Sequence, residues 1–118
     1  MMNDVITRNE VLNDGRSVHL YFNGLVGLYA CYGVSAFLAC RLSGASPSYS
    51  SEMQMPVAVL NADRCGRLVL QGTLVRDVRG YRCVRVASPV SDDEYAAWAC
   101  RLRSGSPSSG SILPGDPL

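Results

Sequence analysis

The chain of 118 residues is long enough for one domain with a single hydrophobic core but too short for two. Its composition, 47% hydrophobic and 18% charged, is ordinary for a globular protein and slightly poor in charge. The formal net charge of +1 excludes an overall field that would attract nucleic acid or anionic lipid. Any such attraction has to be local, and all 11 basic residues are arginines, which bind phosphates and carboxylates bidentately.

We divide the chain into a short lead-in over residues 1–16, a single domain over residues 17–103 and a disordered tail over residues 104–118. The lead-in ends in Asn13-Asp14-Gly15, which is a turn signal. The tail, SGSPSSGSILPGDPL, is rich in Ser, Gly and Pro, a composition typical of disorder.

Residues 18–40 carry no charged side chain and have the length of a membrane span. However, Asn23-Gly24 separates two apolar runs, which is a strong hairpin signal, and further glycines would weaken a continuous helix. We therefore predict a buried hairpin of Val18–Phe22 with Val26–Cys31 and no membrane helix. A helix over Val34–Leu42 should follow, because its apolar residues recur at helical spacing.

A polar loop is expected over residues 43–52. Three extended runs then predict strands at Met55–Asn61, Arg67–Val75 and Tyr81–Ala87. Because turn-forming residues separate these runs, an antiparallel meander is the simplest topology.

The last predicted element is a helix over residues 91–103. Ser91 and Glu94 have the spacing of a capping box, and Asp92, Asp93 and Glu94 lie in the first turn, where the helix dipole favours acids. Consecutive helix positions point in different directions, so these acids cannot converge on one metal ion. We expect no metal site and no cofactor.

The element order is hairpin, helix, three strands, helix. It predicts an α+β (mixed α/β) domain, with one mixed or antiparallel sheet of about five strands and two main helices packed on it.

Two segments, VHLYFNGLVGLYACYGVSAFLACRL and VASPVSDDEYAAWACRLR, make this order similar to one known family. The chain resembles the N-terminal mismatch-recognition domain of the DNA mismatch repair protein MutS over residues 17–103. The resemblance implies a MutS-N-terminal-like sheet and an association with DNA.

In the MutS family, the Phe of a Phe-x-Glu motif stacks on the mispaired base and the Glu hydrogen-bonds to it. Those positions fall on Val26 and Leu28 here, so the resemblance does not imply mismatch specificity. The 118 residues also contain no G-x-x-x-x-G-K-[ST] motif for the MutS ATPase.

An arginine-rich region around the last two predicted strands is the candidate binding site. Arginines that cluster at one hairpin end would contact phosphates, and a tyrosine among them could stack on a base. The competing interpretation is a solvated sheet edge, whose charges discourage edge-to-edge pairing. Strand register decides whether the side chains share a face. The candidate nucleic-acid-binding residues are Arg76, Arg79, Tyr81, Arg82 and Arg85.

Catalytic chemistry finds little support in the sequence. His19, the single histidine, should lie on the same face of its strand as Tyr21 and be a hydrogen-bonded sheet residue. Cys31 is the one cysteine that the predicted hairpin brings near it, and direct contact is not expected. We therefore predict that the protein is not an enzyme.

The remaining cysteines, Cys40, Cys65, Cys83 and Cys100, form no Cys-x-x-Cys pair, and the first residues show no signal peptide. Buried free thiols in a reducing, cytoplasmic setting are the simplest interpretation.

Two function classes remain open. One is a non-catalytic domain that associates with nucleic acid through the arginine region, without mismatch specificity. The alternative is a protein-interaction or assembly module that uses an exposed sheet edge or a tyrosine patch, with Tyr29 and Tyr32 as candidates.

Overall fold

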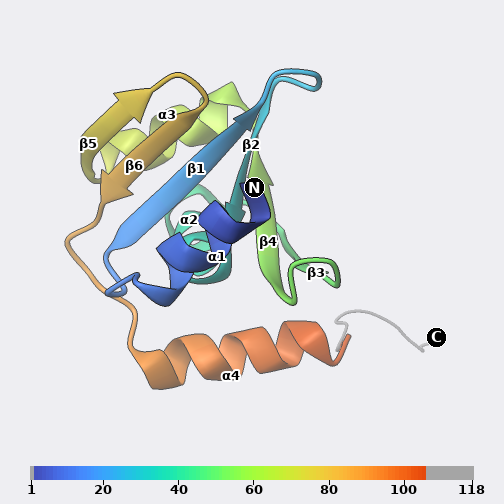
Figure 1. The fold of residues 1–118 in the computed structure, drawn as a ribbon. Coiled ribbons are helices and arrows are strands. Elements are labelled where there is room, and N and C mark those ends of the chain that lie inside the picture. Colours follow the sequence, from blue (N-terminus) through green and yellow to red (C-terminus); the bar gives the residue numbers. More distant parts are fainter. Residues whose placement is uncertain (1, 106–118) are drawn as a thin grey trace.

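Six strands form one antiparallel sheet in the computed structural model, which describes residues 2–105 (Figure 1). The strands lie in the order β3-β4-β2-β1-β6-β5. Their bounds are β1 (Ser17–Asn23), β2 (Leu28–Tyr32), β3 (Pro47–Ser50), β4 (Met55–Leu60), β5 (Thr73–Val78) and β6 (Tyr81–Arg85). The helices within residues 2–105 are α1 (Met2–Val11), α2 (Gly33–Ser43), α3 (Ala62–Leu70) and α4 (Asp92–Arg103). The α+β class is confirmed, with six strands in place of about five.

The two faces of the sheet are covered unequally. On one face, Val18 and Leu20 of β1 are completely buried in a core that also contains Leu38 of α2 and Leu68 of α3. The residues that alternate with them along β1 point to the other face, where α1 lies (Figure 1). One face therefore holds the main core, and the other is covered by a single short helix.

The predicted central hairpin is present, with a longer loop than the Asn-Gly pair requires. Asn23 directs its side-chain oxygen to the Leu25 N–H at 3.0 Å, and its backbone carbonyl accepts the Gly27 N–H at 2.9 Å. The two bonds close a four-residue loop, so β2 begins at Leu28 and Tyr21 pairs with Ala30. The predicted start of the second strand at Val26 is therefore wrong. The following helix is confirmed as α2 and ends at Gly44 in the left-handed conformation, with φ of 74°.

The predicted strand Arg67–Val75 is wrong in its first half, which belongs to α3. Asn61 caps this helix by accepting the Arg64 N–H at 2.9 Å. Cys65 and Leu68 are both buried and lie three residues apart, so they face the core together. The short apolar run in this segment fits a helix as well as a strand.

The predicted meander is also wrong, because α3 separates its strands in space. β4 pairs with β2 and with β3, whereas β5 and β6 form a hairpin that joins the sheet at β1. The polar loop 43–52 contains β3, which becomes one edge of the sheet.

The two ends of the described chain, residues 2–16 and 91–105, each contain a helix. Residues 1–16, expected to be a lead-in, contain α1, which buries Ile6 against the domain. The capping interpretation of α4 is confirmed, since Ser91 accepts the Glu94 N–H at 3.1 Å. The predicted disordered tail lies outside the described residues from residue 106 onward. Within residues 2–105, every helix is too short or too polar to cross a membrane.

Candidate functional site

Strand register divides the predicted arginine region between the two faces of the sheet. Arg82 of β6 pairs with Leu20 and so points to the side of the main core. Tyr81 and Arg85, at alternate positions of β6, point to the side of α1, and Arg76 of β5 lies opposite Cys83 on that same side. The five candidate residues therefore do not form one continuous patch.

Two of the arginines are engaged in ion pairs. Arg82 Nε lies 3.2 Å from Asp77, and its guanidinium sits 5.2 Å from the centre of the Tyr29 ring. Arg85 lies 3.0 Å from Asp14 and donates to Ser17 at 3.0 Å. The hydrogen bond from Arg85 is the main reason that the pKa of Asp14 lies below its usual value. Both pairs are partly exposed and add little to stability, but each neutralises an arginine, so this region presents less positive charge than the sequence suggests.

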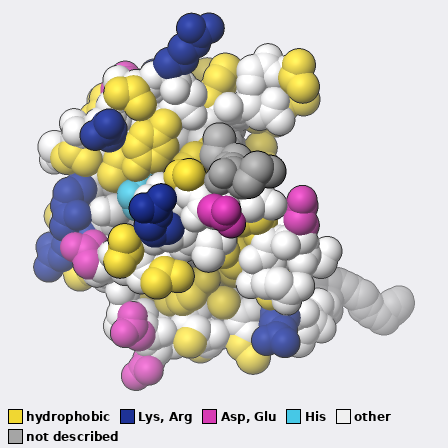
Figure 2. Space-filling model, viewed as in Figure 1, with side chains coloured by type: hydrophobic (Ala, Val, Ile, Leu, Met, Phe, Trp, Pro, Cys, Tyr) yellow, Lys and Arg dark blue, Asp and Glu magenta, His cyan; other side chains and the backbone are white. Residues whose placement is uncertain are grey.

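Arg76 and Tyr81 meet in a groove between α1 and the β5–β6 hairpin. The groove has a volume of about 390 Å³ and is lined by Val5, Asn9, Arg76, Val78 and Tyr81; we call it the α1 groove. Arg76 lies close enough to Tyr81 to affect its pKa. Figure 2 shows basic side chains beside the single histidine and on the β5–β6 side of this face, among apolar groups.

Three arginines near the α1 groove make no ion pair within residues 2–105. They are Arg76 itself, Arg79 in the β5–β6 turn, and Arg8, which follows the groove residue Val5 by three positions on α1. This group differs from the predicted set, because it loses Arg82 and Arg85 and gains Arg8. The sequence does not reveal the place of Arg8, because it predicts no helix in residues 1–16.

A hydrogen-bonded cluster of rings adjoins the groove at Asn9 and Tyr81. His19 Nδ1 lies 2.6 Å from the Tyr81 hydroxyl, and Asn9 of α1 donates to the Tyr21 hydroxyl at 2.8 Å. Burial lowers the pKa of His19, and burial raises the pKa of Tyr81 above its usual range. A neutral imidazole and a protonated phenol therefore share one hydrogen bond, whose direction is set by the imidazole tautomer, and this bond fixes the Tyr81 ring in place. The prediction that His19 is a hydrogen-bonded sheet residue is confirmed.

Beneath the rings, buried Ser35 and partly buried Glu10 form a pair that fastens α1 to the domain. Ser35 Oγ accepts the His19 N–H at 2.8 Å. The same hydroxyl donates to the Glu10 carboxylate at 2.5 Å. Glu10 also accepts the Ser35 N–H at 3.1 Å, and so caps α2, whose own N-cap residue Tyr32 makes no side-chain bond. Burial raises the pKa of Glu10 to about 7. This contact joins residues 25 positions apart and leaves no local pattern in the sequence.

The structure places no activated cysteine at His19. Cys31 lies in the core on the opposite face, where burial raises the pKa of its thiol well above the usual value. Cys83 is the residue directly across from His19, on β6, and burial also raises its pKa. A protonated thiol beside a neutral imidazole is not an activated nucleophile. All five cysteines are free, and Cys100 is exposed, contrary to the prediction that every thiol is buried.

The tyrosine patch that was one candidate interaction surface does not form. Tyr29 packs on Phe22, with ring centres 5.0 Å apart, on the side of the main core. Tyr32 lies at 6.4 Å from Tyr21 on the side of α1. The two tyrosines are half-buried on opposite faces, so they cannot act as one surface.

Comparison with protein-family models, with curated proteins and with solved structures found no match. The resemblance to the MutS N-terminal domain is neither supported nor contradicted by these comparisons and stays a prediction.

Proposed function

We propose that this domain is a non-catalytic binding module that associates with single-stranded nucleic acid through the α1 groove, without mismatch specificity. The observation that carries the proposal is the meeting of Arg76, whose guanidinium makes no ion pair among the described residues 2–105, with the fixed, half-exposed ring of Tyr81. An arginine that contacts a phosphate beside an aromatic ring that stacks on a base is the basic unit of single-strand recognition.

The size of the α1 groove favours a single strand over a duplex. A volume of about 390 Å³ accommodates roughly one unstacked base with its sugar, flanked by the apolar side chains of Val5 and Val78. A duplex offers no free base face, so it would contact the rim arginines alone. The proposed likeness to the MutS domain points to nucleic acid in general and does not favour a single strand, because the MutS domain reads a mispaired base within a duplex. Val26, which stands where the base-stacking Phe would be, is 62% exposed in the hairpin loop and lies outside the groove.

The expected binding is weak and depends on salt. If Arg8, Arg76 and Arg79 each neutralise one phosphate, the logarithm of the affinity for a single strand should fall with the logarithm of salt at a slope of about 2. Affinity should then drop roughly 20-fold between 50 and 200 mM salt.

Fluorescence anisotropy of labelled single-stranded, paired and mismatched DNA, at low and near-physiological salt, tests the proposal. Arg76→Ala should weaken single-strand binding about five- to tenfold, whereas Arg67→Ala, which removes the same charge from exposed α3, should not. Tyr81→Leu should weaken binding about tenfold, and Tyr81→Phe should preserve it because the ring remains. Equal losses for Arg76→Ala and Arg67→Ala, or no binding at micromolar protein in low salt, would overturn the proposal.

A second candidate function, a protein-interaction module, is favoured by the open edge of β5. Every residue of β5 is exposed, and Leu74 and Val75 are 39% and 51% exposed along an edge that pairs with no strand in residues 2–105. An extended peptide could add to such an edge. The irregular register between Leu74 and Arg76 and the charge of Arg76 are features that natural edges use against pairing. Binding of this kind would be insensitive to salt, which separates it from the first candidate.

The free cysteines support the further proposal of a reducing, cytoplasmic location.

A further inference from the structure

A second pocket lies between α4 and the β3–β4 hairpin. It has a volume of about 230 Å³ and shares no residue with the α1 groove. Its lining residues are Tyr49, Gln54, Pro56, Tyr95, Ala96, Ala99, Cys100 and Arg103. We call it the α4 pocket.

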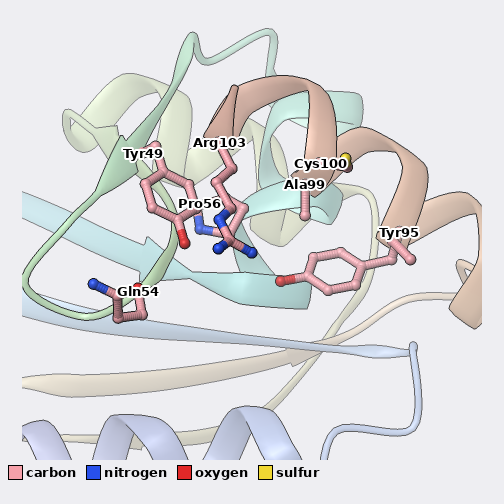
Figure 3. A pocket seen from close by; sticks show the side chains of 8 residues that line it. Tyr49, Gln54, Pro56, Tyr95, Ala99, Cys100 and Arg103 are labelled. Atoms are coloured by element: carbon pink, nitrogen blue, oxygen red, sulfur yellow. The ribbon is translucent and has the colours of Figure 1, made fainter. Parts of the chain in front are cut away.

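The polar groups of the α4 pocket are mostly hydrogen-bond donors. In Figure 3 the Arg103 guanidinium points into the space between the hydroxyls of Tyr49 and Tyr95, and Gln54 lies at the rim. Within residues 2–105, Arg103 has no acidic partner, and the lining contains no carboxylate. The guanidinium and the two phenol hydroxyls can all donate hydrogen bonds into the same space. No negatively charged acceptor lines that space among the described residues.

The protonation state of Tyr95 keeps it a donor. Burial raises the pKa of Tyr95 to about 12, and the proximity of Glu10 and Tyr49 adds to this effect. At neutral pH the hydroxyl is therefore protonated and can donate to an anion. The Tyr95 ring is itself fixed against the single tryptophan, Trp98, with ring centres 6.2 Å apart.

The backbone at the rim is held in an unusual conformation. Gln54 has φ of 58° and is the one non-glycine residue with a positive φ in residues 2–105. Its amide donates to the Ser51 carbonyl at 2.7 Å, which closes the β3–β4 turn against the pocket. Such conformations cost free energy and tend to occur at binding sites.

We propose that the α4 pocket binds the phosphate group of a small phosphomonoester, with Arg103 as a bidentate donor and the hydroxyls of Tyr49 and Tyr95 as flanking donors. The tetrahedral phosphate offers enough oxygens for all three groups at once. A carboxylate has two oxygens in one plane and a single charge, so the arginine fork takes half of its roughly four lone-pair sites. A phosphomonoester has three terminal oxygens and a charge of about −1.5 to −2, so it can give the two phenols an oxygen that the fork does not use. The partial negative charge at the carbonyl end of α4 is about half an elementary charge, which the full charge of Arg103 exceeds. This inference does not depend on nucleic-acid binding at the α1 groove.

Trp98 fluorescence gives a direct assay on the intact chain, because the ring contacts Tyr95. The probes are inorganic phosphate and phenyl phosphate, with acetate and chloride at matched ionic strength. We expect a saturable response to both phosphates and an apparent Kd for acetate that is about tenfold higher or more.

Variants then assign the response to the pocket. Arg103→Gln should raise the Kd for phosphate about tenfold or more, and Tyr95→Phe should raise it a few-fold. Arg101→Gln is the matched control, because Arg101 is exposed on the same helix and does not line the pocket. Equal affinity for phosphate and acetate, equal effects of Arg103→Gln and Arg101→Gln, or no saturable response would each overturn the proposal. Thermal unfolding of each variant checks that the fold is retained.

Discussion

Replacing Glu10 with Gln should remove much of the loss of stability that the protein suffers as the pH rises from 5 to 8. Glu10 is the acid that joins α1 to the N-terminus of α2 through Ser35. A glutamine can keep this geometry, because its oxygen accepts the Ser35 N–H and its amide donates to Ser35 Oγ. The Ser35 hydroxyl can then donate to the Ser17 carbonyl, which lies 3.4 Å away.

The magnitude follows from the pKa of Glu10, which burial raises from 4.5 to about 7. The folded state holds the proton more tightly than the unfolded chain, so this contribution to stability is complete below pH 4.5 and declines until the pH passes about 7. At about 1.4 kcal/mol for each pH unit between 4.5 and about 7, the total loss is roughly 3 kcal/mol, of which about 2.5 kcal/mol falls between pH 5 and 8.

Urea unfolding followed by circular dichroism at pH 5 and pH 8 measures this loss in both proteins. The free energy of unfolding of the wild type should fall by about 2.5 kcal/mol more than that of Glu10→Gln. His19 has a lowered pKa and contributes the opposite slope, but it is present in both proteins and cancels. Cys83 and Tyr21, which face the same cluster, have raised pKa values and titrate above this range. Identical pH dependence in the two proteins would refute the reasoning and show that the Glu10 carboxylate is solvated.

The remaining predictions concern backbone geometry and helix capping. Gly15 has φ of 84°, and a Cβ there would lie 2.5 Å from the Val90 carbonyl oxygen, so Gly15→Ala should lower the free energy of unfolding by about 3 kcal/mol or more. Gly27→Ala, with φ of 69° and open space around it, should cost about 1 kcal/mol, and equal effects in thermal melts would contradict the steric argument. Ser91→Ala removes the cap of α4 and should cost about 1 kcal/mol in urea unfolding. Ser104→Ala, which removes an exposed hydrogen bond to the Arg101 carbonyl at the other end of the helix, should cost less.

Local signals in the sequence predict the elements that local interactions determine. The Asn23-Gly24 hairpin, the helix that ends at Gly44 and the α4 cap at Ser91 each depend on bonds between residues a few positions apart. The error at α3 has the same origin. Its apolar run is short, and Asn61, which caps the helix, is also the last residue of the predicted strand Met55–Asn61 and the first of the turn-forming segment that follows.

The candidate site was harder to predict, because its charges are balanced by residues far away in the chain. The arginine region contains Asp77 as a nearby acid, but Arg85 is paired with Asp14, 71 positions away. A count of charges along the sequence therefore leaves Arg85 without a partner, whereas in the folded sheet it forms an ion pair.

The alternation of side chains along β6 determines which of the candidate residues lie on the same face of the sheet. A strand sends successive side chains to opposite faces, so Tyr81 and Arg82 cannot serve one surface, although they are neighbours in the chain. Arg76 joins Tyr81 in the α1 groove, because its strand β5 pairs with β6. Asn9 joins them from α1, a helix that the sequence did not predict. A mutational scan guided by sequence clustering would therefore rank Arg82 with Arg76. The structure ranks them apart, and Arg82→Ala should disturb stability more than binding, because it leaves Asp77 and the Tyr29 ring without their partner.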